Sequence, residues 1–213
     1  MAPALLLCLA VAVSCDDDDD DDGYSLADEY ATEYIDGHGA VDLGLSVMWA
    51  SCNVGASSPS AYGKYYAWGE VKTKDEYTED NSSYEGVSMS DIAGYSSYDV
   101  AKANWGDSWR MPTLAECQEL IDDCTWEWTK TGGHNGYLVT GPSGSSIFLP
   151  AGGWYYGSSL NYASSSGNYW TGSVDDDDSQ SAYSMDFSSD TYTISSSFRR
   201  YGETIRPVSE GEE

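Results

Sequence analysis

The 213-residue sequence predicts an α+β domain in which a β-rich chain is assembled around one main helix at about residues 113–124. Two observations support this fold class. Thr113 and Glu116 have the S/T-x-x-E spacing of a capping box, and apolar residues then recur at three- and four-residue steps. Downstream, short apolar runs are separated by glycine-rich turn signals, which is typical of hairpin strands.

The N-terminal segment has the pattern of an exported bacterial protein. Residues 1–14 are apolar but too short to span a bilayer as a helix, so we expect a signal peptide. Ala12–Cys15 resembles a lipobox, in which cleavage leaves Cys15 as the lipid-modified first residue. This favours a membrane partner reached through a lipid anchor; an ordinary secretion signal is the alternative.

Residues 15–39 are predicted to be an acidic spacer that precedes the folded domain. Within it, Asp16–Asp22 are seven like charges that repel one another and cannot pack. They are either a solvated spacer or an export signal of the kind that places lipoproteins on the outer face of some Gram-negative cells. Both interpretations predict an outer-membrane lipoprotein exposed at the cell surface.

The charge of the chain excludes two classes of partner. The formal net charge is −27, of which −7 lies in residues 16–22, so the remainder still carries −20. Binding of nucleic acid requires concentrated Lys and Arg, and the whole chain has nine, so no nucleic-acid partner is expected. Attraction to anionic lipid head groups is excluded for the same reason.

The folded domain is predicted at residues 40–209, followed by a tail at 210–213. Val41–Ala50 alternates apolar with small or polar residues, which predicts a half-buried strand. Ser57–Glu70 is rich in aromatic residues and predicts a short helix or turn. Lys72–Tyr98 is polar, acidic and weakly patterned, which predicts a long surface insertion.

The main helix is expected over Leu114–Cys124, with Pro112 just ahead of its cap. Tryptophans at 105, 109 and 126 flank it and supply the apolar surface that a single helix needs to dock on a sheet. Its apolar side consists of Leu114, Cys117, Leu120, Ile121 and Cys124.

Two hairpins are expected after the helix. Gly136–Thr140 and Ser146–Pro150 form the first, and the alternating stretch Tyr183–Phe187 turns at Ser188–Asp190 to form the second. The chain closes on Glu203–Val208. The side chains assigned to the core here are Trp170, Phe187, Phe198 and Arg206, the arginine being paired with a buried acid or with carbonyls.

Three cysteines follow the spacer: Cys52, Cys117 and Cys124. Residues 117 and 124 lie seven apart on one helix, about 10 Å along its axis, which is beyond disulfide reach. If a bridge forms in this oxidising location, Cys52–Cys124 is the expected pair. Three separate buried thiols are the alternative.

Several motifs, in this order, resemble one known family. The chain is similar to the Fibrobacter succinogenes major paralogous domain of secreted bacterial lipoproteins, which is itself similar to the C-type-lectin-like fold of formylglycine-generating enzymes and retroelement variable proteins. The resemblance covers about residues 40–209 and implies twisted antiparallel sheets with one main helix and long loops. The motifs are Val41–Ala50, Tyr66–Glu70, Trp109–Thr113, Phe148–Gly152 and Ile205–Val208.

The sequence predicts neither catalytic residues nor a cofactor. His38 and His134, the two histidines of the chain, lie in Gly-rich polar stretches typical of solvated loops, so no Ser-His-Asp set or His-rich metal site is expected. Asp175–Asp178 could supply oxygen ligands to calcium, but four adjacent side chains cannot all converge on one ion. We therefore expect a solvated acidic loop and no metal.

The region 152–169 has the composition of a binding loop, since it is uncharged and rich in Tyr, Ser, Gly and Asn. The second hairpin continues the same composition. Retroelement variable proteins diversify such positions, so the resemblance implies a diversified binding face; ordinary strand and turn residues of a secreted β-protein are the alternative. The predicted ligand-binding residues are Trp154, Tyr155, Tyr156, Asn161, Tyr162, Asn168, Tyr169 and Tyr192.

The first functional hypothesis is a non-enzymatic surface lipoprotein that binds an extracellular protein or glycan through this face. A second is an enzyme-like domain acting on surface polysaccharide or protein, for which Asp186 and Asp190 could supply carboxylates. A third is a structural component of the surface or of an appendage.

Overall fold

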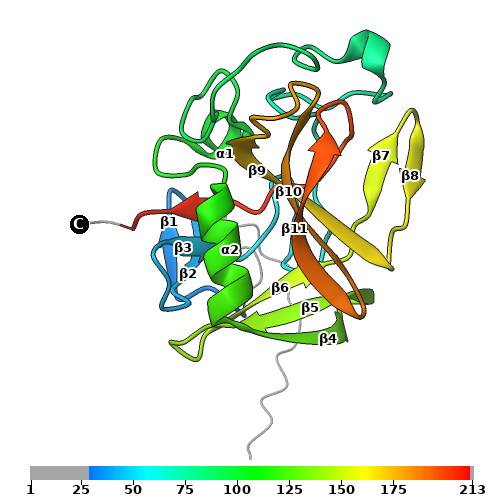
Figure 1. The fold of residues 1–213 in the computed structure, drawn as a ribbon. Coiled ribbons are helices and arrows are strands. Elements are labelled where there is room, and N and C mark those ends of the chain that lie inside the picture. Colours follow the sequence, from blue (N-terminus) through cyan, green and yellow to red (C-terminus); the bar gives the residue numbers. More distant parts are fainter. Residues whose placement is uncertain (1–28, 212–213) are drawn as a thin grey trace, which may run out of the picture.

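The computed structural model describes residues 29–211, which form mostly antiparallel sheets with few helices (Figure 1). The sheet orders are β1-β2-β3-β12, β4-β5-β6, β7-β8 and β11-β10-β9. The predicted signal peptide, Cys15 and the aspartate run lie outside the described residues. The elements are β1 (Glu33–Ile35), β2 (His38–Val41), β3 (Met48–Ala50), η1 (Glu79–Asn81), α1 (Val100–Trp105), α2 (Leu114–Asp123), β4 (Thr125–Thr131), β5 (His134–Thr140), β6 (Ser146–Pro150), β7 (Trp154–Tyr156), β8 (Ser159–Asn161), β9 (Ser166–Val174), β10 (Ser181–Ser188), β11 (Thr191–Phe198) and β12 (Val208–Ser209).

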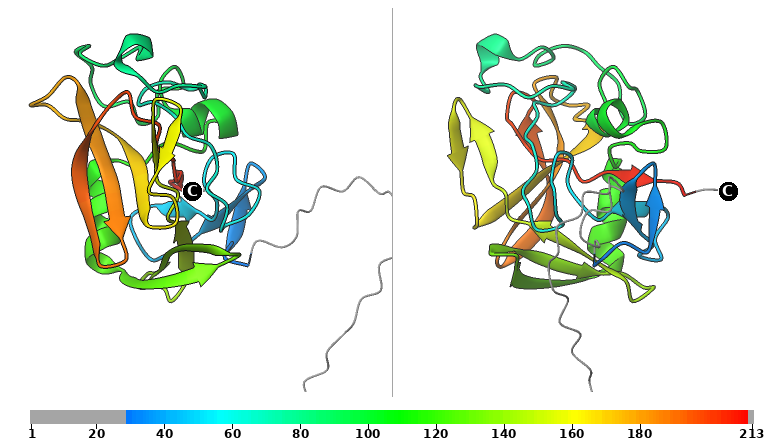
Figure 2. Two further views of the ribbon diagram at one scale, coloured as in Figure 1. Left: turned by 90° about the vertical axis from the view of Figure 1, so that its right-hand side faces the viewer. Right: turned by 180° about the vertical axis from the view of Figure 1, so that it is seen from behind.

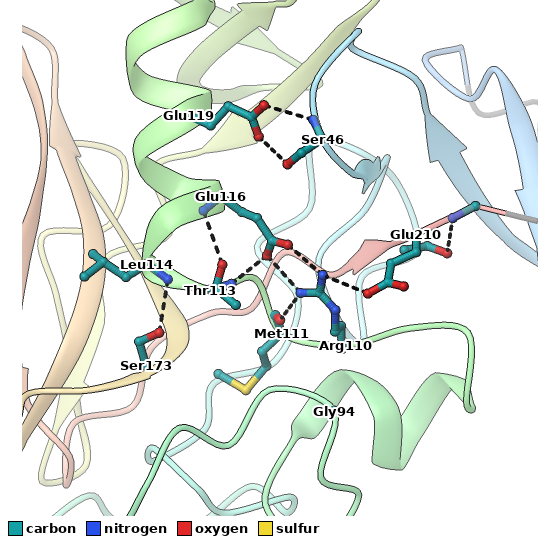
Figure 3. A network of polar contacts seen from close by, with 12 residues as sticks. Ser46, Gly94, Arg110, Met111, Thr113, Leu114, Glu116, Glu119, Ser173 and Glu210 are labelled. Atoms are coloured by element: carbon teal, nitrogen blue, oxygen red, sulfur yellow. Dashed lines mark hydrogen bonds and ion pairs between the residues drawn. The ribbon is translucent and has the colours of Figure 1, made fainter.

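The predicted main helix is confirmed as α2, and its capping box forms as expected. The Thr113 hydroxyl accepts a hydrogen bond from the Glu116 amide at 3.3 Å, and Glu116 accepts one from the Thr113 amide at 2.8 Å. Arg110 adds a bidentate ion pair to the Glu116 carboxylate, at 2.6 and 2.8 Å (Figure 3). The helix start is therefore fixed to the preceding segment as well as to its own backbone.

Helix α2 stands where three sheets meet (Figure 1). Cys117 and Leu120 of α2 are buried in the largest apolar cluster. Side chains from the terminal sheet (β1-β2-β3-β12), from β5–β6 and from β9–β10 complete this cluster. Burial of this apolar surface is the main stabilising contribution. The sheet residues of this cluster include Val41, Trp49, Val139, Ile147, Leu149, Met185, Phe187 and Val208.

The prediction of one strand over Val41–Ala50 is wrong, because the stretch contains the end of β2, a loop and β3. Gly44 has a positive φ of 78°, and its amide donates to the Asp42 carboxylate at 2.7 Å. A strand cannot continue through a left-handed residue. Leu43 and Val47 are nonetheless buried, so the alternating pattern reflected burial on a loop.

Both predicted hairpins are confirmed. In β5–β6, Leu138 pairs with Phe148, and in β10–β11, Met185 pairs with Ile194. The sequence interpretation missed β4, which extends the first hairpin, and β9, which extends the second. In the second sheet, β9 is central to the fold because it connects β10 to the C-terminal segment at Thr204.

Ordered structure begins ahead of the predicted boundary at residue 40, since β1 and the first half of β2 lie in the stretch assigned to the spacer. β12, near the C-terminus, pairs with β3 and completes the terminal sheet. Trp109 packs here and its indole N–H donates to the Ile35 carbonyl at 3.1 Å, so it anchors β1 and does not dock α2 on a sheet.

The stretch predicted as a surface insertion, Lys72–Tyr98, packs in part against the sheet. Tyr77 and Ile92 are buried, and the Ile92 amide donates to the Gly172 carbonyl in β9 at 2.8 Å. Arg199, itself buried, donates to the carbonyls of Tyr84 and Val87. Backbone bonds to a sheet and a buried guanidinium thus hold a segment that has little regular structure.

None of the helices within residues 29–211 has the length and apolar character needed to cross a membrane.

Candidate ligand-binding site around the β7–β8 hairpin

The β7–β8 hairpin lies on the side of the domain opposite β1–β3 (Figures 1 and 2). Its register pairs Trp154 with Asn161 and Tyr156 with Ser159. Two further backbone pairings fix its position. Tyr155 and Gly202 exchange hydrogen bonds of 2.8 and 3.1 Å, and Gly157 and Tyr77 exchange bonds of 2.8 and 2.9 Å. The outer edge of β7 and the turn that follows it are therefore held by two segments distant in sequence.

Tyr155 points toward a tyrosine cluster on one face of the hairpin. Its ring lies 4.9 Å from that of Tyr65 in an edge-to-face arrangement and 5.6 Å from that of Tyr77. The Tyr65 hydroxyl donates to the Gly152 carbonyl at 2.6 Å, and the Tyr77 hydroxyl donates to the Tyr65 carbonyl at 2.5 Å. Burial raises the pKa of Tyr77 to about 12, so the phenol stays protonated and remains a donor at neutral pH.

A pocket of about 460 Å³ opens beside this cluster and is lined by residues from 63–65, 73–77, Tyr155 and Ser158. We call it the tyrosine pocket. Its volume lies within the range of about 300–1,000 Å³ that small-ligand sites occupy. Lys64 is exposed at the pocket, whereas the Lys74 ammonium is held by the Glu70 carboxylate at 2.7 Å and the Asn81 carbonyl at 2.6 Å. The site combines aromatic faces with one available cation, Lys64, and one exposed carboxylate, Asp75.

The other face of β7 forms a second aromatic group. Trp154 lies 4.5 Å from Tyr201, and Tyr156 lies 5.7 Å from the same ring. Tyr156 is 53% exposed, and Tyr162, beyond the end of β8, is 67% exposed. Asn161 is partly buried, and its side chain donates to the Ser159 carbonyl. Five of the eight predicted binding residues therefore lie on or next to the hairpin with some surface available: Trp154, Tyr155, Tyr156, Asn161 and Tyr162.

Asn168 and Tyr169 do not belong to a binding face, and this part of the prediction is wrong. They lie in β9, where Tyr169 is 2% exposed and Asn168 is 8% exposed. The Tyr169 hydroxyl donates to the Pro150 carbonyl at 2.7 Å, and its ring stacks near Phe187. Because β9 is covered on both faces, its uncharged residues fill the interior.

Tyr192 is exposed but belongs to a different region. Its ring stacks on that of Trp126 with centroids 4.7 Å apart, beside Tyr137 and Phe187. These residues come from β4, β5, β10 and β11, and they adjoin the core around α2. The predicted single face is thus divided between the β7–β8 hairpin and a separate aromatic group around Trp126 and Tyr192.

The residues assigned to the core are buried, except Phe198, which is partly exposed. The Arg206 guanidinium donates to the carbonyls of Ala50, Ser51 and Phe148 at 2.7–3.0 Å and to the Asn53 side chain at 2.7 Å. Arg206 was expected to pair either with a buried acid or with carbonyls, and these contacts are to carbonyls.

The histidines are not solvated loop residues. The His38 ring stacks on Trp105 at 3.9 Å, and burial lowers its pKa despite the nearby Asp36. His134 begins β5 and tilts against Tyr62 at 4.6 Å. Neither ring lines the tyrosine pocket.

Cys52, Cys117 and Cys124 form no disulfide, so the alternative of three separate thiols applies and the conditional Cys52–Cys124 pairing does not; of the three, Cys117 is fully buried. Burial raises the pKa of the Cys117 thiol, and it raises that of Cys124 to about 11, so both stay protonated at neutral pH. They serve as small apolar residues on and beside α2.

The acidic residues fall into two groups. In the run 175–178, Asp175 and Asp178 accept hydrogen bonds from nearby backbone amides and serine hydroxyls. Asp190 lies exposed at the β10–β11 turn, whereas Asp186 is partly buried and its carboxylate accepts hydrogen bonds from the hydroxyls of Ser184 and Ser195. Within residues 29–211, no three His, Cys, Asp and Glu side chains gather as a metal site would require.

The residues of the site that sequence reasoning missed are Lys64, Tyr65 and Tyr77. The aromatic richness of Ser57–Glu70 was the one local signal for the pocket, but nothing in it indicated contact with a hairpin ninety residues later. No protein-family model, curated protein or solved structure matches the chain.

Proposed function

We propose that this domain is a non-enzymatic binding module that takes an extracellular glycan or protein ligand at the tyrosine pocket and the adjoining β7–β8 hairpin. The observation that carries the proposal is the pocket of about 460 Å³ beside three clustered tyrosines. Aromatic rings with a few polar groups are the usual lining of ligand sites. Tyr155 would contribute its ring to the ligand, and Lys64 would contribute a charged hydrogen-bond donor.

The exposure of the hairpin supports the same proposal. Tyr156, Leu160 and Tyr162 are 53%, 38% and 67% exposed, and all three lie on or next to this one hairpin. Exposed apolar side chains that gather in one place, in contrast to scattered ones, are typical of interaction sites. Tyrosine is well suited to contact a ligand, because it offers a large amphipathic surface and has few rotatable bonds to fix.

We further propose the C-type-lectin-like fold for the domain and an outer-membrane lipoprotein, anchored through Cys15 and exposed at the cell surface, for the chain. Support for the fold comes from the motif order, the single main helix between sheets and the long loops. Support for the anchor comes from the lipobox and the aspartate run alone. Residues 156–162 would be the positions to diversify if the chain is a retroelement target.

A polysaccharide-binding assay tests the proposed function. Purified protein is passed over a panel of immobilised neutral and acidic bacterial polysaccharides, alongside Tyr155→Ala, Tyr156→Ala and the control Tyr34→Ala. Tyr34 is 59% exposed in β1, at the other side of the domain. We expect retention on at least one polysaccharide, loss with Tyr155→Ala and Tyr156→Ala, and no change with the control. Retention that all three variants share would refute a site at this hairpin.

A further inference from the structure

Strand β11 forms one edge of the sheet β11-β10-β9, and no further strand of residues 29–211 pairs with it there (Figure 1). The opposite edge, β9, is occupied by the chain itself. The Trp170 amide donates to the Thr204 carbonyl at 3.0 Å, and the Ile92 amide donates to the Gly172 carbonyl at 2.8 Å. Within the described part of the chain, the sheet is therefore open on the β11 side.

The hairpin geometry decides which backbone groups of β11 point outward. A two-residue turn joins β10 to β11, so the first pair, Ser188 and Thr191, exchanges both of its backbone hydrogen bonds. Bonded and non-bonded pairs then alternate along the strand. The residues whose amides and carbonyls point away from β10 are Tyr192, Ile194 and Ser196. The Thr193 hydroxyl reaches one of these carbonyls, that of Ile194, at 3.2 Å, which fits an outward direction.

Strand β11 has none of the features by which edge strands usually avoid pairing with another chain. Those features are short length, charged side chains, proline and bulges. β11 is eight residues long, contains no charged residue and no proline, and pairs with β10 without a register shift. By contrast, β4, the edge of another sheet, carries the exposed Glu127 and Lys130. The β11 edge is thus an unprotected template for a further strand.

Carboxylates lie at both ends of this edge. Asp190 is exposed at the turn that leads into β11. At the other end lies the run Asp175–Asp178, where the Ser196 hydroxyl donates to the Asp175 carboxylate at 2.6 Å. The charges of this run, that of Asp175 first, raise the pKa of Tyr183, which pairs with Ser196 across the hairpin. The edge therefore lies in a negative field.

The nearest cations do not offset this field. The sequence has no Lys or Arg between Lys130 and Arg199. Arg199 is buried, and Arg200 is paired with Glu85. Electrostatic complementarity then favours an added strand that carries basic side chains and disfavours one that carries acidic side chains.

We propose that the β11 edge binds an extended, lysine- or arginine-bearing segment of another polypeptide, which adds as a fourth strand to the sheet. Its main chain bonds to the outward groups of Tyr192, Ile194 and Ser196, and its basic side chains meet the carboxylates at the two ends of β11. A second copy of this chain fits poorly, because two chains of net charge −27 repel each other. The surface is separate from the tyrosine pocket and does not depend on the ligand proposed there.

Fluorescence anisotropy of a labelled peptide, titrated with the full chain, tests the proposal. The probe is a synthetic peptide of about eight residues, the length of β11, in which lysine alternates with valine or threonine. Its acidic counterpart has glutamate in place of each lysine. We expect saturable binding of the lysine peptide, weakened by added salt, and no binding of the glutamate peptide.

Ser196→Pro tests the edge itself. It removes an outward amide and leaves the bonds to β10, and proline is tolerated on an edge strand where its nitrogen faces solvent. We expect it to weaken binding of the lysine peptide by about tenfold or more. The matched control is Ser196→Ala, which loses the bond to Asp175 but keeps the amide, and it should bind the peptide as the wild type does. The Tm of each variant shows whether it folds.

A double variant, Asp176→Asn with Asp190→Asn, tests the charges without altering the strand, since both side chains are exposed. It should weaken binding of the lysine peptide a few-fold and reduce its salt dependence. Wild-type affinity in this variant would overturn the proposal even if Ser196→Pro did not fold.

Three other results would also overturn the proposal. The first is the absence of binding by the lysine peptide, and the second is equal binding of the lysine and glutamate peptides. The third is a folded Ser196→Pro variant that binds as tightly as Ser196→Ala. A wild-type dimer that Ser196→Pro dissociates and the lysine peptide does not displace would assign the edge to a second copy instead.

Discussion

Replacing Glu116 by alanine should destabilise the domain by about 3 kcal/mol, because one side chain carries two separate functions at the start of α2 (Figure 3). It completes the capping box with Thr113, which is worth about 1 kcal/mol. It also accepts two charged hydrogen bonds from Arg110, which together contribute about 1.5–3 kcal/mol. The pair is largely shielded, with side chains 19% and 12% exposed, so solvent screening is limited.

For a domain of this size, a loss of about 3 kcal/mol lowers the Tm by about 6–12 °C. Glu116→Gln separates the two contributions, since glutamine at the same position can still reach back to the Thr113 amide but carries no charge. We expect it to lower the Tm by roughly half as much. The matched control is Gln118→Ala in the same helix, where the side chain is exposed and the effect should stay within about 0.5 kcal/mol.

The pH dependence supplies a second readout of the same side chain. Burial alone would raise the pKa of Glu116, but the hydrogen bonds from Arg110 and Thr113 outweigh it and hold the pKa below its ordinary 4.5. Its stabilising contribution is therefore complete above pH 4.5 and is lost as the pH falls through the lowered value. The Tm difference between wild type and Glu116→Gln should shrink below pH 4.5. An equal difference at pH 7 and pH 3, or a Glu116→Ala variant as stable as Gln118→Ala, would refute the reasoning.

Three further changes are expected to act on the interior. Arg206→Lys leaves some of the carbonyls now bonded by the guanidinium without a donor and should lower stability by about 3 kcal/mol, measured by denaturant unfolding. Tyr169→Phe removes the donor to the Pro150 carbonyl and should destabilise by about 1–3 kcal/mol while leaving ligand affinity unchanged, because the ring is buried. A reducing agent should not change the Tm, because Cys52, Cys117 and Cys124 form no disulfide; a lower Tm would reveal a bridge.

The sequence predicted those elements whose determinants lie within a few residues of one another. The cap of α2 needs only Thr113 and Glu116, and its apolar side follows from three- and four-residue steps within ten residues. The β5–β6 and β10–β11 hairpins have their turn residues between their strands. Where one residue overrode a regular pattern, as Gly44 does with its positive φ, the local prediction failed.

The candidate site could be predicted only in part. The high Tyr, Ser and Asn content of residues 152–169 identified the region that contains the β7–β8 hairpin. The same residue types, however, occupy both the buried β9 and the exposed hairpin. Tyr169 and Tyr156 differ in exposure because β9 is covered on both faces, which composition does not encode. The tyrosine pocket joins Tyr65, Tyr77 and Tyr155, and this contact arises from backbone pairing between segments about eighty to ninety residues apart.

Hydrogen–deuterium exchange with and without a bound ligand, such as the best-retained polysaccharide of the panel, tests the central claim most directly. The proposed site predicts that protection on binding concentrates in residues 63–77 and 153–162, the two segments that enclose the tyrosine pocket. Protection confined instead to the turn near Tyr192 and to β4 near Trp126 would place the ligand on the aromatic group that Trp126 and Tyr192 form. That result would contradict the account.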